Sequence, residues 1–322
     1  MRSRFLHNGI CTSSIKRHYS SQLNTFRAND FCILRDRRKG QKFFIGPLKD
    51  EGKLFISKGV VSHKDIISKP PRSIINTHNG STTLTAHFPT LDDYILNVKR
   101  ACTPIYPKDA STIVRFLDLD PGAHVLEAGT GNGSLTLYLA RAVAGSIDTM
   151  EGAKVQQGRV DTFDIRESHI RQAEQTVGNF ARGVYGPTVK FHSGSPSSVL
   201  SDDLDSLYDG AVLDMPEPRH ELGVVVQHLK NDRFLVCYLP NITQVVDLLS
   251  FIKKNNMPLA MDDCVDVMIQ EWEVRSTLIR NPQNDGASQE PQDPVWICRP
   301  KNFDVKGHTA YLIKLRKCQN ID

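Results

Sequence analysis

The most informative segment of the chain reads Val125-Leu126-Glu127-Ala128-Gly129-Thr130-Gly131-Asn132-Gly133-Ser134. Its apolar opening predicts a buried strand over 124–127 that ends in an acid, Glu127. The apolar spacing that follows predicts a helix over 134–143. Three glycines at alternate positions join these two elements. A strand, a glycine-rich turn and a helix in this order are typical of a βαβ unit in a parallel sheet.

The spacing of the three glycines indicates the class of ligand. The pattern is Glu-x-Gly-x-Gly-x-Gly, whereas dinucleotide-binding proteins have Gly-x-Gly-x-x-Gly, and no lysine of a nucleotide-hydrolysing phosphate loop is present. Glycine lets the backbone approach a ligand closely, which suits S-adenosylmethionine, because its methionine end needs backbone contacts rather than a phosphate cradle. We therefore expect Glu127, Gly129, Gly131 and Gly133 to bind this cofactor. The alternative is a turn whose glycines serve packing alone.

Helix and strand patterns alternate on both sides of this loop. Helices are predicted over 92–100, 109–117, 134–143 and 167–180, and strands over 124–127, 160–165, 188–192, 210–215, 233–239 and 309–315. Such alternation predicts an α/β domain with a doubly wound, mostly parallel sheet over residues 89–322. Residues 281–294 have no apolar periodicity and predict a disordered insertion in that domain.

A small β domain is expected before the α/β domain, over residues 23–88. Short β-type runs at 31–34, 42–45, 53–57 and 82–85 are separated by turns rich in Gly, Pro, Lys and Asp.

The composition excludes several classes of protein. The 322 residues are 39% hydrophobic and 24% charged, which excludes disorder of the whole chain. No apolar run approaches the about 20 residues of a membrane helix, so we expect no membrane association. The seven cysteines are scattered without a Cys-x-x-Cys pair, which argues against a metal site and against a disulfide framework.

Basic residues are concentrated at the amino terminus. Residues 1–29 contain five Lys and Arg and no acid, whereas the other 35 Lys and Arg are balanced by 36 Asp and Glu. An Arg-rich, Ser-rich and acid-free segment over 1–22 is typical of a mitochondrial transit peptide, and Arg17-His18-Tyr19-Ser20 resembles a matrix-processing site. We expect the protein in the mitochondrial matrix; the alternative is a disordered basic tail. A nucleic-acid partner would be bound by local patches.

Two further acids follow predicted strands. Asp164 ends the second strand, where an acid binds ribose hydroxyls in open α/β sheets; it can equally cap the helix that begins near Glu167. Asp214 ends the fourth strand, in Leu213-Asp214-Met215-Pro216-Glu217-Pro218. The two prolines stiffen the backbone beside the edge where ligands bind. From spacing alone, Asp214 is as readily a turn former as a catalytic residue.

Several segments of the chain carry a family resemblance. They are Ser57 to Ile67, Phe88 to Arg100, Ile105-Tyr106-Pro107-Lys108-Asp109-Ala110, Glu127 to Thr136, the Leu213 to Pro218 segment and Gly307-His308-Thr309-Ala310-Tyr311-Leu312. In these segments, which span nearly the whole chain after residue 25 in the family's order, the chain resembles the tRNA (adenine-58-N1)-methyltransferase family, in its catalytic-subunit type and in a mitochondrial, fungal-like form.

This resemblance implies a class I S-adenosylmethionine-dependent methyltransferase with a small N-terminal β domain that holds RNA. It implies transfer of a methyl group to N1 of the T-loop adenosine of mitochondrial tRNA. It also implies either a homo-oligomer, specifically a tetramer, or a complex with a noncatalytic paralogue. Residues carried over to the cofactor pocket are Tyr106, Glu127, Gly129, Gly131, Gly133, Ser134, Leu135, Asp164 and Ser195. Asp214 matches the catalytic aspartate, and His308 with Thr309 match a segment near the active-site cleft, on the substrate side.

The chemistry fits an acid at position 214. Adenine N1 has a free lone pair, so attack on the methyl group requires alignment more than proton removal. A carboxylate that accepts a hydrogen bond from the N6 amine would stabilise the developing positive charge and then take the proton. The target base must also be pulled out of its stack in the folded tRNA.

Two positions depart from the family. Ser195 stands where the family has an acid for the adenine amine of the cofactor, and Arg219 stands where a Trp is common. These departures leave two alternatives open: a methyltransferase-like RNA-binding or assembly factor without turnover, or N1-adenine methylation of mitochondrial rRNA or mRNA.

Three other side chains have two interpretations each. Lys108 either contacts substrate phosphates or lies on a solvated helix surface. Trp272 and Trp296 either stack on a base or, as is more common for single aromatics near strands, belong to the core.

Overall fold

The computed structural model describes residues 24–38, 40–147, 156–200, 207–277, 295–302 and 306–318. The predicted transit peptide over 1–22 and the predicted insertion over 281–294 lie outside the described residues. In the described part of the chain, no helix has both the length and the apolar character needed to cross a bilayer.

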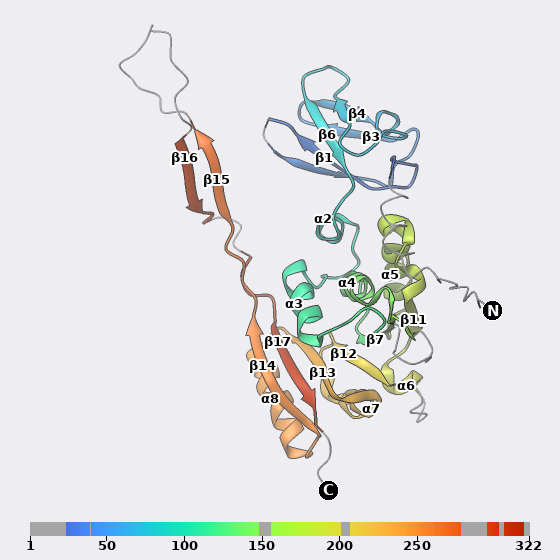
Figure 1. The fold of residues 1–322 in the computed structure, drawn as a ribbon, viewed down its shortest axis with the longest axis vertical. Helices are drawn as coiled ribbons and strands as arrows, with labels where there is room; N and C mark the ends of the chain where they lie inside the picture. Colours follow the sequence, from blue (N-terminus) through green and yellow to red (C-terminus); the bar gives the residue numbers. More distant parts are fainter. Residues whose placement is uncertain are drawn as a thin grey trace, which may run out of the picture.

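A seven-stranded sheet forms the centre of the larger domain (Figure 1). Its strand order is β11-β10-β7-β12-β13-β17-β14. In chain order the strands are β7 (His124–Ala128), β10 (Arg159–Asp164), β11 (Val189–Ser193), β12 (Tyr208–Leu213), β13 (Leu229–Leu239), β14 (Leu259–Asp266) and β17 (Tyr311–Lys317). The first five are mutually parallel, and β17 lies antiparallel between β13 and β14. The predicted doubly wound α/β sheet is confirmed.

Helices cover both faces of this sheet, because its central strands are apolar on both sides. The helices are α3 (Pro107–Leu117), α4 (Ser134–Val143), α5 (Glu167–Asn179), α6 (Pro196–Val199), α7 (Leu222–His228) and α8 (Ile242–Lys254). Side chains alternate between the faces: Val125 and Val212 pack with α3, α4 and α5, whereas Leu126 and Leu213 pack with α7 and α8. Helices on both faces of the sheet thereby hold the ends of β7 and β12 in place.

Several boundaries differ from those predicted. The helix expected over 92–100 is α2 (Leu91–Asn97); it begins behind a capping box of Thr90 with Asp93 and ends because Val98 is extended. The helix expected over 109–117 begins at Pro107, whose ring suits the first helical position. The sequence patterns did not identify α7, α8 or β14, although the buried residues of α8, Val245, Leu248 and Ile252, have helical spacing.

The N-terminal β domain has a core of its own. A four-stranded antiparallel sheet has the order β2-β1-β6-β5, and β3 pairs with β4 in a separate hairpin. The elements are β1 (Cys32–Asp36), β2 (Lys42–Ile45), β3 (Lys53–Ile56), β4 (Gly59–Ser62), the 3-10 turn η1 (His63–Asp65), β5 (Ile74–Asn76) and β6 (Thr83–His87). Leu34, Leu48 and Leu84 are fully buried between these elements.

This β domain packs on α2 and on η2 (Phe180–Gly183), the turn that follows α5. Aromatic rings from both sides meet there, with Tyr94 against Phe31 (5.2 Å between centroids) and against Phe180 (5.1 Å). The Arg182 guanidinium donates to both Asp30 carboxylate oxygens, at 2.9 and 2.7 Å. Because this ion pair is largely buried, it fixes the small domain on the large one.

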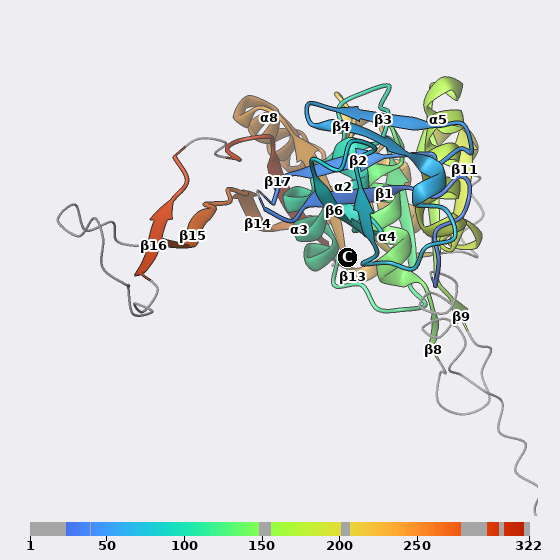
Figure 2. The same cartoon turned by 90° about the horizontal axis from the view of Figure 1, so that it is seen from above.

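A two-stranded arm projects from the body of the molecule (Figures 1 and 2). It consists of β15 (Trp272–Thr277) and β16 (Val295–Pro300), paired antiparallel, and it leaves the sheet between β14 and β17. Trp272 and Trp296 lie on this arm and are 56% and 61% exposed. Their assignment to the core is therefore wrong, because no other layer of the described chain covers the arm.

Candidate active site and cofactor pocket

The glycine loop packs tightly against the end of β12 and against α5. Gly129, Gly131 and Gly133 all have positive φ, at +102°, +53° and +75°, a region that disfavours other residues. A Cβ on Gly129 would lie 2.0 Å from the backbone oxygen of Asp214, and one on Gly133 would lie 3.1 Å from Ala173. The glycines therefore do serve packing, as the alternative interpretation of this loop proposed. This packing brings the loop against the end of β12.

Glu127 is a fully buried acid beneath this loop. Its Oε2 accepts a hydrogen bond from the Thr136 hydroxyl at 2.6 Å. The Thr162 hydroxyl is a second polar neighbour of this carboxyl group. The Thr162 hydroxyl on the paired strand shares a 2.6 Å hydrogen bond with Thr130. Burial raises the pKa of Glu127 to about 8, and the carboxylates of Asp214 and Asp164 contribute to the rise.

Asp164 lies at the end of β10 and holds the glycine loop. Its Oδ2 accepts hydrogen bonds from the Gly131 backbone N–H at 3.0 Å and from His169 Nδ1 at 3.1 Å. Its Oδ1 accepts from the Arg166 backbone N–H at 2.9 Å. The helix-cap alternative is wrong, because Arg166 is the N-cap residue of α5. A carboxylate has about four acceptor positions, so one remains for a ligand hydroxyl.

Asn132 clamps the segment before α3 onto the loop. Its Oδ1 accepts from the backbone N–H groups of Ala101 (2.9 Å) and Cys102 (3.2 Å), and its Nδ2 donates to the Cys102 carbonyl at 2.6 Å. The clamped segment leads directly to Tyr106, the N-cap residue of α3. The role of Asn132 was not predicted from the sequence, although a polar side chain between two loop glycines was an available signal.

Asp214 follows β12 immediately beside Gly129. Its backbone N–H donates to the Ala128 carbonyl at 2.8 Å, which continues the pairing of β12 with β7. Among the described residues, its carboxylate has no hydrogen-bond partner. Burial, and then the charge of Asp164, raise the pKa of Asp214 to about 7. A partly buried carboxyl group with a pKa near neutrality is typical of a group that works in catalysis.

The predicted substrate residues come together at one pocket. A cavity of about 530 Å³ is lined by Leu96, Tyr106, Lys108, Ile269, His308 and Thr309, among others. Tyr106 also lines a second cavity, of about 370 Å³, formed with residues 100–104. It therefore lies between the substrate-side pocket and the segment that covers the glycine loop.

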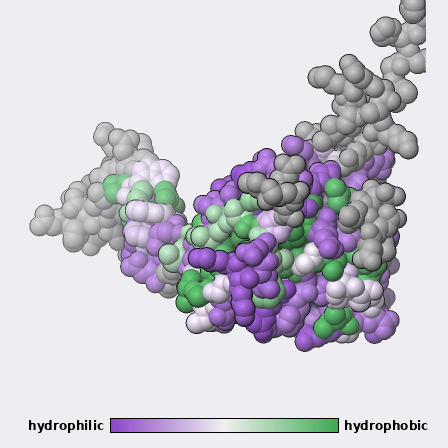
Figure 3. All heavy atoms as spheres, turned by 90° about the horizontal axis from the view of Figure 1, so that it is seen from below, coloured by the Kyte–Doolittle hydropathy of each residue, from purple (hydrophilic) through white to green (hydrophobic). Residues whose placement is uncertain are grey.

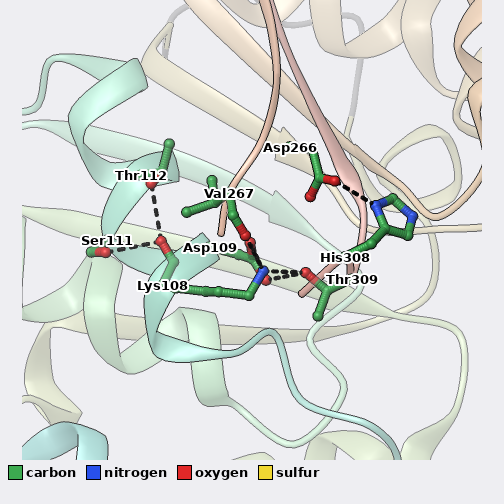
Figure 4. A network of polar contacts seen from close by, with 8 residues as sticks. All are labelled: Lys108, Asp109, Ser111, Thr112, Asp266, Val267, His308 and Thr309. Atoms are coloured by element: carbon green, nitrogen blue, oxygen red, sulfur yellow. Dashed lines mark hydrogen bonds and ion pairs between the residues drawn. The ribbon is translucent and has the colours of Figure 1, made fainter. Parts of the chain in front are cut away.

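Lys108 is buried, so its assignment to a solvated helix surface is wrong, whereas its contact with the substrate stays a prediction (Figure 4). Its ammonium donates to Asp109 Oδ1 (2.9 Å), to the Val267 carbonyl (2.7 Å) and to the Thr309 hydroxyl (2.6 Å). Thr309 in turn donates to Asp109 Oδ2 at 2.7 Å. Asp109, whose role was not predicted, is the last residue of the Tyr-Pro-Lys-Asp segment. This network ties α3 to both ends of the segment that carries the arm.

His308 bridges two elements at the mouth of the same pocket (Figure 4). Its Nδ1 lies 3.0 Å from Asp266 Oδ2 and its Nε2 lies 2.9 Å from the Pro240 carbonyl. Both neighbours are acceptors, so both ring nitrogens must carry protons to donate. The Pro240 carbonyl and the Asp266 carboxylate accordingly raise the pKa of His308. The group is exposed, and its bridge is lost as the pH rises above that pKa.

Three predicted cofactor residues have clear structural roles. Ser195 is the N-cap residue of α6 and forms a capping box with Ser198. Leu135 lies in the core beside α3 and β7, so only its backbone is available to a ligand. Ser134 is buried in the first turn of α4. Their contacts with a cofactor stay predictions.

The charges around the loop fit a cationic cofactor. The carboxylates of Glu127, Asp164 and Asp214 lie close enough for their charges to interact. S-adenosylmethionine carries both a sulfonium and an ammonium group, which would relieve this repulsion. The fold and this arrangement define a class I methyltransferase that depends on S-adenosylmethionine.

The sequence profile described as "tRNA methyltransferase complex GCD14 subunit" matches residues 87–312. The chain belongs to this family of tRNA methyltransferases. It is 38% identical over 285 residues to tRNA (adenine(58)-N(1))-methyltransferase TrmI of Thermus thermophilus, covering 88% of this chain and 96% of that one. It is 26% identical over 231 residues to the catalytic subunit TRM61 of Candida glabrata, covering 69% and 61%.

A solved structure has the same architecture. The tRNA (m1A58) methyltransferase TrmI of Aquifex aeolicus superposes with a TM-score of 0.68 at 26% identity, covering 92% of this chain and all of that one. The two chains are thus similar in fold over most of their length.

We predict that Gly129→Ala removes cofactor binding and lowers the free energy of unfolding by at least about 2 kcal/mol, because the added Cβ meets the Asp214 backbone. Urea denaturation and calorimetric titration with S-adenosylmethionine measure both effects. Gly178→Ala is the matched control: Gly178 lies in α5 with open space at its Cβ, so this change should stabilise by about 0.5–1 kcal/mol. Equal behaviour of the two variants would contradict the packing argument.

Proposed function

We propose that the protein transfers the methyl group of S-adenosylmethionine to N1 of adenosine 58 in tRNA, and that its substrate is mitochondrial tRNA. The observation that carries the proposal is the Asp214 carboxyl group, which lies against the glycine loop with no hydrogen-bond partner in the described chain. The reaction named for the Thermus and Aquifex relatives supports the choice of position 58.

The bound cofactor supplies an electrophilic methyl group on a sulfonium. The chain supplies alignment: Asp164 holds the Gly131 backbone, and Asn132 holds the segment that leads to Tyr106. Both contacts are made by buried or largely buried side chains, so the loop is ordered before the ligand arrives. Holding two reactants in line lowers the barrier by removing entropy losses from the reaction step.

Asp214 acts on the target base. Its ionised carboxylate can accept a hydrogen bond from the exocyclic amine of adenine, and this bond strengthens as N1 becomes alkylated and the ring becomes cationic. The same oxygen can then take the amine proton. A pKa of about 7 leaves the carboxyl group ionised in about half of the molecules at neutral pH. The pocket beside Tyr106 is the place for the rest of the extruded nucleotide.

We predict that kcat/KM for tRNA methylation rises with pH through about 7, because the ionised form of Asp214 is required and its pKa is raised. Asp214→Asn should lower the rate by at least about 100-fold and abolish this dependence. Incorporation of labelled methyl groups from about pH 5.5 to about pH 8.5 measures the profile over a range that brackets this pKa. Reverse-transcription stops locate the product.

Glu217→Gln is the matched control for this experiment. Glu217 is an exposed acid in the same segment and pairs with Arg219, so its loss should leave the rate almost unchanged. A wild-type rate in Asp214→Asn would remove this residue from the mechanism.

The same carboxyl group should make stability depend on pH. Because the folded state raises the pKa of Asp214, its ionisation destabilises the fold as the pH rises above the ordinary Asp value, fully so above pH about 7. Asp214→Asn should therefore melt at a higher temperature than wild type at about pH 8, with the gap closing toward about pH 4. Calorimetric melting curves of both proteins at several pH values measure this gap, and a gap that does not change with pH would contradict the raised pKa.

We propose that residues 1–22 direct the protein to the mitochondrial matrix, on the strength of their acid-free, Arg-rich composition. The segment fused to a fluorescent protein should enter mitochondria and be shortened near Ser20, as measured by microscopy and mass spectrometry. The same fusion with Arg2, Arg4, Lys16 and Arg17 replaced by Ser is the control and should stay in the cytosol. Cytosolic fluorescence of the unchanged segment would contradict the assignment.

We propose that the arm joins two copies of this chain. Trp272, Val274 and Cys298 share one face with Trp296, because directly paired residues of antiparallel strands point the same way. The two Trp residues and Val274 are more than half exposed, and green residues gather on the arm in Figure 3. A lone two-stranded hairpin is marginally stable in water, so this apolar face needs a cover.

The charges of the arm favour a second copy of this chain as the partner that covers its apolar face. On its other face, Glu273 pairs with Arg275 and with Arg299, each at 2.7 Å. At its base, Glu271 pairs with Lys301 (2.8 Å) and Lys306 (2.6 Å). Each of these four cations already has a carboxylate partner, so less of their charge is available to RNA. The apolar face favours a second copy of itself in a two-fold contact.

We predict that replacing Trp272 and Trp296 by Ser converts the oligomer to smaller species, because two exposed aromatic anchors are lost. Sedimentation equilibrium of the wild type and the variant measures the change. The control replaces Arg275 and Arg299 by Ser on the opposite face of the same strands and should leave the mass unchanged. A wild-type protein that is monomeric alone would overturn self-association and point to a different chain as the partner.

A further inference from the structure

A depression of about 400 Å³ lies on the N-terminal β domain, apart from the glycine loop and the Tyr106 pocket. Three turns form it: the one after β1, the one between β3 and β4, and the one before β6. Its lining is Asp36, Arg37, Arg38, Lys58 and the Gly80–Thr83 segment. The cavity therefore joins three cationic side chains to a hydroxyl-rich turn.

The three turns are tied to one another. Asp36 Oδ1 accepts from the Arg38 backbone N–H at 2.8 Å, and Asp36 Oδ2 accepts from Lys58 Nζ at 3.3 Å. The Ser81 hydroxyl donates to the Lys58 carbonyl. The backbone N–H of Arg37 donates to the Thr83 carbonyl at 3.3 Å. These contacts fix the walls of the depression before any ligand binds, which lowers the entropy lost on binding.

The side chains around the depression leave positive charge and a hydroxyl unused. The guanidinium groups of Arg37 and Arg38 have no acceptor in the part of the chain that the structure describes, and both residues are exposed. Lys58 shares the buried Asp36 carboxylate, so the lining carries a formal charge of +2 from three cations and one acid. The Thr82 hydroxyl is buried in the wall, and it has no hydrogen-bond partner among the described residues.

The formal charge of the chain is also distributed unevenly, with the positive charge in the small domain. Residues 24–88 contain twelve Lys and Arg against five Asp and Glu, a formal charge of +7, whereas residues 89–322 contain 24 against 31, a formal charge of −7. A polyanion is therefore attracted to the small domain and repelled by much of the large one. The small domain is where a long-range electrostatic contact with RNA has to be made.

We propose that this depression binds a backbone phosphate of the RNA substrate, with Arg37 and Arg38 as the donors to its oxygens. Arginine presents paired N–H groups that match the oxygens of a phosphate. Lys58 adds a point charge. The inference rests on the proposed function, because it takes tRNA as the source of the phosphate.

The test uses the full chain with both arginines changed, Arg37→Ala and Arg38→Ala together. The dissociation constant for an unmodified tRNA transcript should rise about tenfold, and the slope of its logarithm against the logarithm of salt concentration should fall by about 2. The KM for tRNA should rise by the same factor, with kcat at saturating tRNA and affinity for S-adenosylmethionine unchanged. Filter binding at several salt concentrations and steady-state methylation provide these values.

The matched control replaces Lys64 and Lys69 by Ala, which removes the same charge from exposed positions of the same domain outside the depression. It should change affinity less than about twofold by the same electrostatic argument. If both double variants weaken RNA binding equally, the depression is not a site and only the overall charge matters. If the protein methylates no tRNA but the arginine variant alone loses RNA affinity, the proposed activity fails and the phosphate site stands.

Discussion

The close approach of Gly129 to the backbone of Asp214 is the constraint on which the site depends. Strands β7 and β12 are paired neighbours, and their ends meet because position 129 has no side chain. The contact places an acid carried by one strand beside the loop carried by the other. It also concentrates Glu127, Asp164 and Asp214 around one small volume, which is why burial and mutual repulsion raise the pKa of Glu127 and Asp214.

The central sheet and the acids at its strand ends were predictable from sequence because they depend on local patterns. A strand apolar on both faces, a glycine turn and a helix can each be recognised in a short window, and parallel strands bring their carboxyl ends to one edge. Glu127, Asp164 and Asp214 were placed on this basis, and all three lie around the loop.

The features that the sequence did not predict depend on contacts between distant segments. Lys108 has the pattern of a surface cation on a helix, yet its ammonium is buried by Val267 and Thr309, which lie far along the chain. Trp272 and Trp296 were expected in the core, yet they lie on a hairpin that no described layer covers. Asn132 was overlooked because its partners, Ala101 and Cys102, belong to a segment without regular structure. None of these environments follows from the period of a single element.

The placement of the arm has a consequence for how the chain tolerates change. Asp266, the last residue of β14, pairs directly with Tyr311, the first residue of β17. The segment between them therefore leaves the sheet and returns to it at adjacent points. The entropic cost of closing such a loop grows only slowly with its length. Residues can therefore be inserted into or deleted from the arm without shifting the register of the seven strands. Evolution can thus revise the outer part of the molecule while the catalytic framework is left as it is.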